Sequence, residues 1–118
     1  MFLLLFLVIY YPPIIIRGNS MNPNIHSGAV LGVRIDQQHL QGSIEGNVYW
    51  FKTQEDSIHR GKNVVHRAIE NRDGCVVMKG DNNPLDDGCI PYEDIEVKIY
   101  EDTNVNFFYE DTNLNFLK

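Results

Sequence analysis

Short apolar runs separated by polar turn residues dominate the hydrophobic pattern of this chain. Five runs are rich in Val, Ile, Tyr and Phe, and they cover residues 30–35, 48–51, 63–69, 75–78 and 95–100. Glycine, asparagine and aspartate fill the intervals between them, and no stretch has a long apolar period of 3.6 residues. The pattern therefore predicts a mostly β protein, a folded sheet of short strands.

Two of the intervals carry their own predictions. Asp73-Gly74 lies between the runs 63–69 and 75–78, which is the placement expected of a tight hairpin turn. Segment 53–62 is polar along its whole length, so we expect a loop there.

The most apolar segment is the N-terminal one. Residues 1–11 contain no charged side chain, and Pro12-Pro13 and an isoleucine run precede the first charge at Arg17. As a helix, residues 1–11 would be about 17 Å long, whereas a bilayer core is about 30 Å thick. A cleaved signal peptide would have a basic n-region and a small-x-small site, which this segment lacks. A buried core segment is the third alternative. We expect residues 1–16 to be a short apolar segment that associates with a membrane.

Composition and charge narrow the classes of function. The chain has 118 residues, of which 43% are hydrophobic and 22% charged, as in one globular domain. Acidic residues outnumber Lys and Arg by 16 to 10, and the basic residues are scattered. This charge argues against a nucleic-acid partner bound by phosphate neutralisation. Cys75 and Cys89 lack the spacing of a zinc site, so they are either a disulfide or two free thiols.

The C-terminal tail contains a tandem repeat. Residues 100–108 read YEDTNVNFF and residues 109–117 read YEDTNLNFL, so only two positions differ. Two copies are too few for a solenoid. We interpret 101–118 as a repeat-containing tail, either a hairpin or a loose extension, and assign it no function.

Three segments hold residues capable of chemistry, although each has an ordinary structural explanation. Ser20 lies among turn-forming residues, where serine is usually a local capping residue. His66 interrupts a strand-like run, and such a histidine is usually a hydrogen-bonded core residue. Alternation puts it on one face with Val64 and Ala68. Residues 79–87 read KGDNNPLDD, by default a solvated turn whose spacing does not match an EF-hand calcium loop.

Taken together and in order, these segments resemble signal peptidase I, in the archaeal and endoplasmic-reticulum branch that uses serine, histidine and aspartate. The matching elements are SMNP at Ser20, VHRAI at His66, and KGDNNPLDD at residues 79–87, within a resemblance that covers roughly residues 14–100. The bacterial branch and the self-cleaving repressor peptidases have a lysine base where this chain has His66. The resemblance implies a signal-peptidase-like folded β-sheet domain, assigned to residues 17–100, that needs no cofactor or metal.

The resemblance also implies a role for each residue. Ser20 is the expected nucleophile, and its backbone N–H is the expected oxyanion donor. His66 is the expected general base. Asp87 is expected to orient the His66 ring, with Asp81 as a second essential acid, although the sequence does not separate these two roles. The chain departs from the family pattern at Gly18, where many members have a serine, and at Ala29 and Asn47, where aspartates are common.

The implied activity is the removal of signal peptides from preproteins by cleavage after small residues. The implied partners are the preproteins, the lipid bilayer and further subunits of a signal peptidase complex, and the implied location is the extracytoplasmic or lumenal face of a membrane. We expect Met21 and Ile25 to be exposed apolar residues that contact substrate or membrane. The alternatives are a self-cleaving or dedicated-substrate serine peptidase, and a non-catalytic β module of the same fold.

Overall fold

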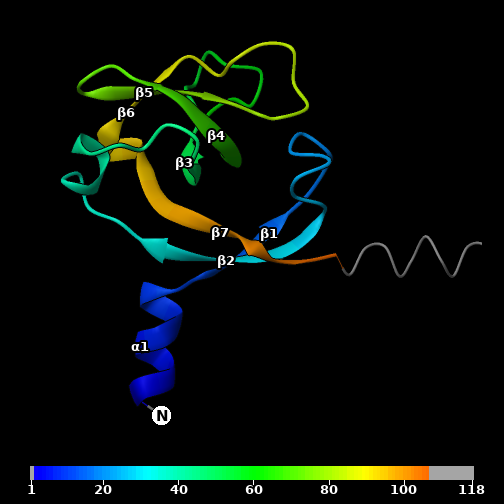
Figure 1. Cartoon of the computed structure of the whole chain (residues 1–118), viewed down its shortest axis with the longest axis vertical. Helices are drawn as coiled ribbons and strands as arrows, with labels where there is room; N and C mark the ends of the chain where they lie inside the picture. Colours follow the sequence, from blue (N-terminus) through cyan, green and yellow to red (C-terminus); the bar gives the residue numbers. More distant parts are fainter. Residues whose placement is uncertain (1, 107–118) are drawn as a thin grey trace, which may run out of the picture.

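A computed structural model describes residues 2–106 of the chain. In this part, seven strands follow one short α-helix, and Figure 1 shows their arrangement. The elements are α1 (Phe2–Tyr10), β1 (Pro13–Ile16), β2 (Gly28–Arg34), β3 (Val48–Lys52), β4 (Asn63–Asn71), β5 (Cys75–Lys79), β6 (Cys89–Pro91) and β7 (Ile95–Val105). Short 3-10 helices cover His39–Gln41 and Tyr92–Asp94. The prediction of a mostly β fold is confirmed.

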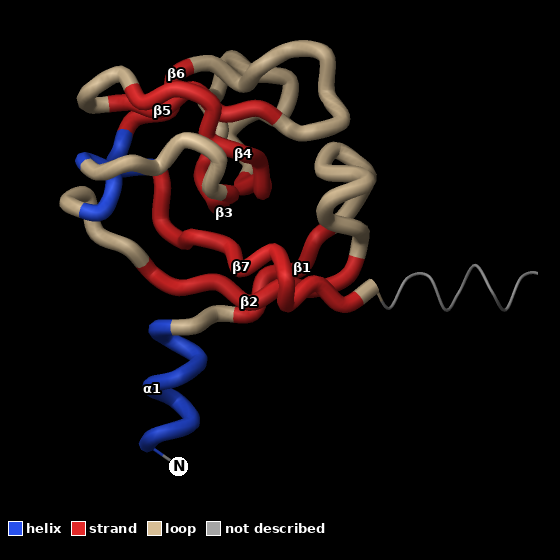
Figure 2. The backbone as a smooth tube through the Cα atoms, in the orientation of Figure 1, coloured by secondary structure: helices blue, strands red, loops and turns tan. Residues whose placement is uncertain are grey.

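All seven strands belong to one antiparallel sheet with the order β1-β2-β7-β3-β4-β5-β6. The long strand β7 joins the two halves, since it pairs with β2 on one side and β3 on the other. The sheet curls strongly, so that β3, β4 and β5 lie across from β1 and β2 (Figure 2). Irregular register within the β2–β7, β3–β7 and β4–β5 pairs accompanies this curl.

The curled sheet has a hydrophobic cluster on each face, and the alternation of β3 separates them. Val48 belongs to the first cluster, and Trp50 packs against it. Tyr49 and Phe51 belong to the second cluster. The first cluster also holds Ile14, Ile16, Met21, Ile25, Val30, Val65, Val97 and Ile99. The second also holds Leu40, Ile44, Ala68, Val76, Met78, Ile90 and Ile95.

The expected exposure of Met21 and Ile25 is wrong. Both side chains are buried, with 1% and 0% of their surface exposed. The 17–27 connection folds back over the sheet, and these two side chains fill the first cluster beside the isoleucines of β1. They therefore anchor the segment that carries Ser20.

The N-terminal segment divides into two parts. Residues 13–16 form β1, and alternate side chains of this strand enter the core. Helix α1 instead projects away from the sheet (Figure 1) with the apolar side chains of residues 3–10 exposed, so the alternative of a buried core segment is wrong for this part. Arg34 Nε donates a hydrogen bond to the carbonyl of Ile9 at 2.7 Å. Within residues 2–106, no helix has the length and apolar character needed to cross a bilayer.

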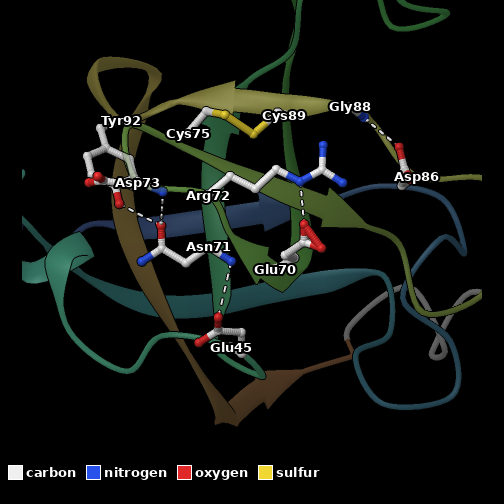
Figure 3. The surroundings of a disulfide bond; sticks show 10 residues. All are labelled: Glu45, Glu70, Asn71, Arg72, Asp73, Cys75, Asp86, Gly88, Cys89 and Tyr92. Atoms are coloured by element: carbon white, nitrogen blue, oxygen red, sulfur yellow. Dashed lines mark hydrogen bonds and ion pairs between the residues drawn. A yellow bond between two sulfur atoms is a disulfide. The ribbon is translucent and has the colours of Figure 1, made fainter.

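The two cysteines form a disulfide that joins β5 to β6 (Figure 3). The hairpin prediction at Asp73-Gly74 is confirmed, since this turn connects β4 to β5, and both residues have positive φ. Strand β7 continues to Val105, so the first repeat copy begins inside the sheet. The second copy, residues 109–117, lies outside the described residues.

Candidate active site

Ser20, His66 and Asp87 form a continuous hydrogen-bonded chain, although they come from three separate parts of the sequence. Ser20 lies in the connection between β1 and β2, His66 lies in β4, and Asp87 lies in the connection between β5 and β6. Ser20 Oγ is 3.1 Å from His66 Nε2. His66 Nδ1 is 2.6 Å from Asp87 Oδ2. Both distances are within the range of a hydrogen bond.

The chemistry of the three groups fixes the direction of both hydrogen bonds. An ionised carboxylate only accepts, so His66 Nδ1–H donates to Asp87. In a neutral imidazole the other nitrogen is then an acceptor, and it receives the hydroxyl proton of Ser20. This is the tautomer that a histidine base requires.

The side chains of the site differ in how much of their surface is exposed to solvent. His66 is 1% exposed, and the Asp87 side chain is 6% exposed. The ring of Phe51 packs edge-on against the His66 ring. Ser20 is partly exposed. A substrate can therefore reach the hydroxyl oxygen, while the histidine and its carboxylate stay sheltered from water.

Asp81 lies near this chain but has a different partner. Its carboxylate accepts two hydrogen bonds from Arg67, of 2.9 and 2.8 Å, and one of 2.8 Å from Asn24. The hydrogen bonds that Arg67 donates to Asp81 lower the pKa of Asp81 below its ordinary value. The hydrogen bonds that Arg67 donates to Asp81 and Glu101 raise the pKa of Arg67. Asp81 therefore links the β5–β6 connection to Arg67 of β4, and its hydrogen bonds are not to His66.

The backbone around Ser20 is held by the Gly80–Asn83 turn. The Asn82 N–H donates to the Ser20 carbonyl at 2.7 Å, and the Asn82 side-chain amide donates to the Asn19 carbonyl at 3.1 Å. A side chain at Gly80 would place its Cβ 2.9 Å from the Ser20 carbonyl oxygen and 2.6 Å from the Asn83 amide nitrogen. Glycine is therefore required for this close approach of two backbone segments.

Two hollows meet at Ser20. The first, of about 390 Å³, lies between the end of β1 and the start of β4, and Ile16, Trp50 and Val65 line part of it. The second, of about 550 Å³, lies between the 53–62 loop and the segment that precedes β6. Ile58 and Leu85 line the second hollow and are largely exposed. The nucleophile thus has room for a chain on both sides.

His59 is a neighbour of the site that sequence reasoning missed. Its Nε2 lies 3.9 Å from Asp87 Oδ1, and its ring centroid is 5.7 Å from that of His66. The ligand atoms of His59, His66 and Asp87 all lie within 4.8 Å of one another, close enough to suggest a cation site. No spacing along the chain indicates this, because His59 lies in the polar 53–62 loop and only the fold brings it to Asp87.

Arg67, Asn82 and Glu101 are further residues to which sequence reasoning gave no role. Arg67 and Asn82 fall inside the motifs that carry the resemblance, so the sequence did contain an indication that they lie near the site. Glu101 falls in the first repeat copy, and it accepts two hydrogen bonds from Arg67, of 3.1 and 2.8 Å. Glu101, in the first part of the expected tail, therefore belongs to the same ion-pair network as Arg67 and Asp81.

Comparisons of the chain with models of known protein families, with curated proteins and with solved structures find no match. The geometry of Ser20, His66 and Asp87 is therefore the observation from which a function is inferred.

Proposed function

We propose that this protein is a membrane-associated serine endopeptidase of the signal peptidase I type. It cleaves N-terminal signal peptides from preproteins through an acyl-enzyme on Ser20. The observation that carries the proposal is the hydrogen-bonded chain from Ser20 through His66 to Asp87. A hydroxyl, an imidazole and a carboxylate in this order are the parts that nucleophilic acyl transfer requires.

The first half of the reaction uses these groups as follows. Ser20 Oγ attacks the scissile carbonyl carbon while its proton passes to His66 Nε2. Asp87 stabilises the imidazolium that forms and keeps the ring in position. His66 then gives the proton to the leaving amine as the peptide bond breaks, and the acyl group remains on Ser20. In the second half, His66 activates a water that hydrolyses this ester and restores the Ser20 hydroxyl.

The backbone N–H of Ser20 supports the oxyanion in this scheme. Within residues 2–106 it donates to no other group, so it is available to the carbonyl oxygen of a bound peptide. Gly18 carries no hydroxyl that can act as a second donor. Losing one oxyanion donor typically costs about 10²–10³ in rate, so we expect slower turnover than in an enzyme with two donors.

The proposed substrate lies as an extended strand along β1 and enters the first hollow. β1 is an edge strand of the sheet, so one side of its backbone has no strand partner within the described part of the chain. An added strand can pair there by main-chain hydrogen bonds. The preference for small residues before the cut comes from the resemblance to signal peptidases.

The proposed membrane contact is α1, whose apolar side chains are exposed. Only β1 and a short turn separate this helix from Ser20. A helix anchored in the lipid would thus hold the whole domain, which carries Ser20, at the membrane.

A preprotein reporter tests the proposal. Membranes carrying the wild-type chain, Ser20→Ala or His66→Ala are mixed with reporters, and the mature product is identified by its N-terminal residue. We expect release after a small residue by the wild type and at least a 10³-fold loss in both variants. A serine-directed fluorophosphonate should label the wild type and not Ser20→Ala.

The outcomes separate the alternatives. Cleavage of several unrelated preproteins supports a general signal peptidase. Cleavage of one reporter alone, or of the chain itself, indicates a dedicated or self-cleaving peptidase. If folded wild type is neither labelled nor more active than Ser20→Ala, the catalytic proposal fails and the chain is a non-catalytic β module.

A further inference from the structure

His59 has an imidazole nitrogen whose environment the proposed reaction leaves unexplained. Its Nε2 atom is buried and has no hydrogen-bond partner within residues 2–106. Asp87 Oδ1 lies 3.9 Å from this nitrogen, which is too far for a hydrogen bond. A buried polar atom without a partner is unfavourable, because it has lost its hydrogen bonds to water. The site therefore presents an unsatisfied ligand atom facing the carboxylate of the triad.

We propose that His59, His66 and Asp87 form a regulatory zinc site that switches the peptidase off. Two imidazole nitrogens and one carboxylate are a typical donor set for Zn²⁺ with a fourth position open to water. The ligand atoms lie within 4.8 Å of one another. Zinc would bind His59 Nε2, His66 Nδ1 and the Asp87 carboxylate.

Occupation requires a small local rearrangement. Ligands about 2.0–2.1 Å from zinc in a tetrahedron are roughly 3.3 Å apart. The 2.6 Å contact between His66 Nδ1 and Asp87 must therefore open, and His59 must approach both. His66 is fixed by β4, whereas His59 and Asp87 lie in connections outside the strands. The movement can thus occur without breaking the strand pairing of the sheet.

The bound cation would inactivate the triad by changing the tautomer of His66. Zinc takes the lone pair of Nδ1, so the single N–H proton of the neutral ring moves to Nε2. Nε2–H then faces Ser20 Oγ as a donor and no longer accepts the hydroxyl proton. Zinc itself does not bind Ser20. Removal of zinc returns the proton to His66 Nδ1, and Nε2 can again act as the base.

Calorimetry with Zn²⁺ tests the site without relying on activity. The proteins are the wild type, His59→Gln, Ser20→Ala and the matched control His26→Gln, which removes an exposed histidine outside the cluster. We expect one site in the wild type, Ser20→Ala and His26→Gln. Loss of a group that merely supports a ligand already weakens zinc binding by about 10–100-fold. His59→Gln should therefore lose at least that much. Mg²⁺ should not bind, because it prefers oxygen ligands.

The regulatory part of this inference rests on the proposed function, so a second measurement accompanies the first. Reporter cleavage is compared with and without zinc for each variant, and a chelator is then added. We expect reversible inhibition of the wild type and His26→Gln and at least tenfold less inhibition of His59→Gln. Zinc binding without any peptidase activity would overturn the proposed function and leave the metal site standing. Equal zinc affinity of wild type and folded His59→Gln, or no binding to either, would overturn the metal site and leave the peptidase untouched.

Discussion

Asp87 and Asp81 are carboxylates of the same connection, yet their neighbours give them different tasks. Asp87 accepts from His66 Nδ1, and Asp81 accepts from Arg67 and Asn24. We predict that Asp87→Asn lowers kcat by about 10⁴, because an amide at this position favours the wrong histidine tautomer. The measurement is reporter cleavage at equal concentrations of folded protein, judged by circular dichroism.

Asp81→Asn is the matched control for this prediction. It removes the same charge from the same segment without touching His66. We expect it to lower the melting temperature and to leave the activity of the folded fraction within about tenfold of wild type. A folded Asp81→Asn protein as inactive as Asp87→Asn would contradict the division of roles.

The pairing of Asp81 with Arg67 predicts how stability depends on pH. The hydrogen bonds from Arg67 lower the pKa of Asp81 in the folded protein below its ordinary value of 3.8. Its contribution to stability is therefore present above that value and is lost as pH falls through the lower folded-state pKa. Urea unfolding of the wild type should show this acid loss. In Asp81→Asn, part of the slope below pH 4 should be missing, and an unchanged slope would contradict the assignment.

The sequence predicts a site residue when a short motif identifies it, and fails when the role depends on contacts between segments distant in sequence. Ser20, His66 and Asp87 fall in short motifs that together resemble a peptidase family, and this resemblance makes them candidates, although it does not separate the role of Asp87 from that of Asp81. Met21 and Ile25 were misjudged, because the burial of a loop side chain depends on where the loop folds. His59 was missed for the same reason, since only the folding of the 53–62 loop brings it to Asp87.

At the scale of elements, the segment that carries Asp87 is held at both ends. It leaves β5 and enters β6, and the disulfide between Cys75 and Cys89 joins these two strands (Figure 3). The backbone N–H of Asp87 also donates to the Met78 carbonyl at 2.7 Å. The covalent link and the strand pairing together restrict where the carboxylate can lie.

We predict that the disulfide stabilises both the fold and the site. The cross-link closes a loop of 14 residues. A loop of this size corresponds to about 3 kcal/mol in the chain-entropy description. Cys75→Ala with Cys89→Ala should therefore lower the melting temperature by roughly 10 °C. Reporter cleavage below the new melting temperature should also decrease, because Asp87 is less restrained.

Reduction of the wild type provides the control. Dithiothreitol should destabilise the wild type and have no effect on the double variant. If the two oxidised proteins melt at the same temperature, the disulfide contributes nothing measurable and the restraint on Asp87 comes from strand pairing alone.

Element positions were more predictable than element partners. The runs at 48–51, 75–78 and 95–100 all became strands, because Val, Ile and aromatic residues with turn signals on either side leave few alternatives. The pairing of β7 with both β2 and β3 was not predictable, since it joins segments distant in sequence. Residues 13–16 illustrate the limit. Their apolar character suits a membrane segment and a core strand equally. Their pairing with β2 in the structure shows that they form a strand of the sheet.

At the scale of the whole molecule, the apolar helix and the candidate active site occupy different parts of one short chain. Helix α1 projects from the sheet beside β2, whereas the three connections that carry Ser20, His59 and Asp87 lie on the opposite side of the view, at the upper right of Figure 1. The domain folds around its own two clusters and does not need α1 as a core element. An exposed apolar helix that the core does not use is costly in water, which favours a role in binding a lipid surface.

We predict that the protein binds membranes and that α1 supplies this affinity. Leu4 and Leu7 are 67% and 43% exposed, and each would bury its side chain in a lipid interface. Burial of one leucine contributes roughly 1.5–3 kcal/mol. Leu4→Glu with Leu7→Glu should therefore weaken binding to phospholipid vesicles at least about 100-fold, as measured by co-sedimentation.

Ile58→Glu with Leu85→Glu is the matched control, because it places two charges on exposed apolar residues of the domain rather than on the helix. It should keep most of the vesicle binding. Both double variants should label normally with the serine-directed probe in detergent, since neither alters the hydrogen bonds of His66. If the control loses as much vesicle binding as the helix variant, the membrane contact is the rim of the second hollow. Ser20, which also lines that hollow, would then face the bilayer, and α1 would not be the part that holds the domain at the membrane.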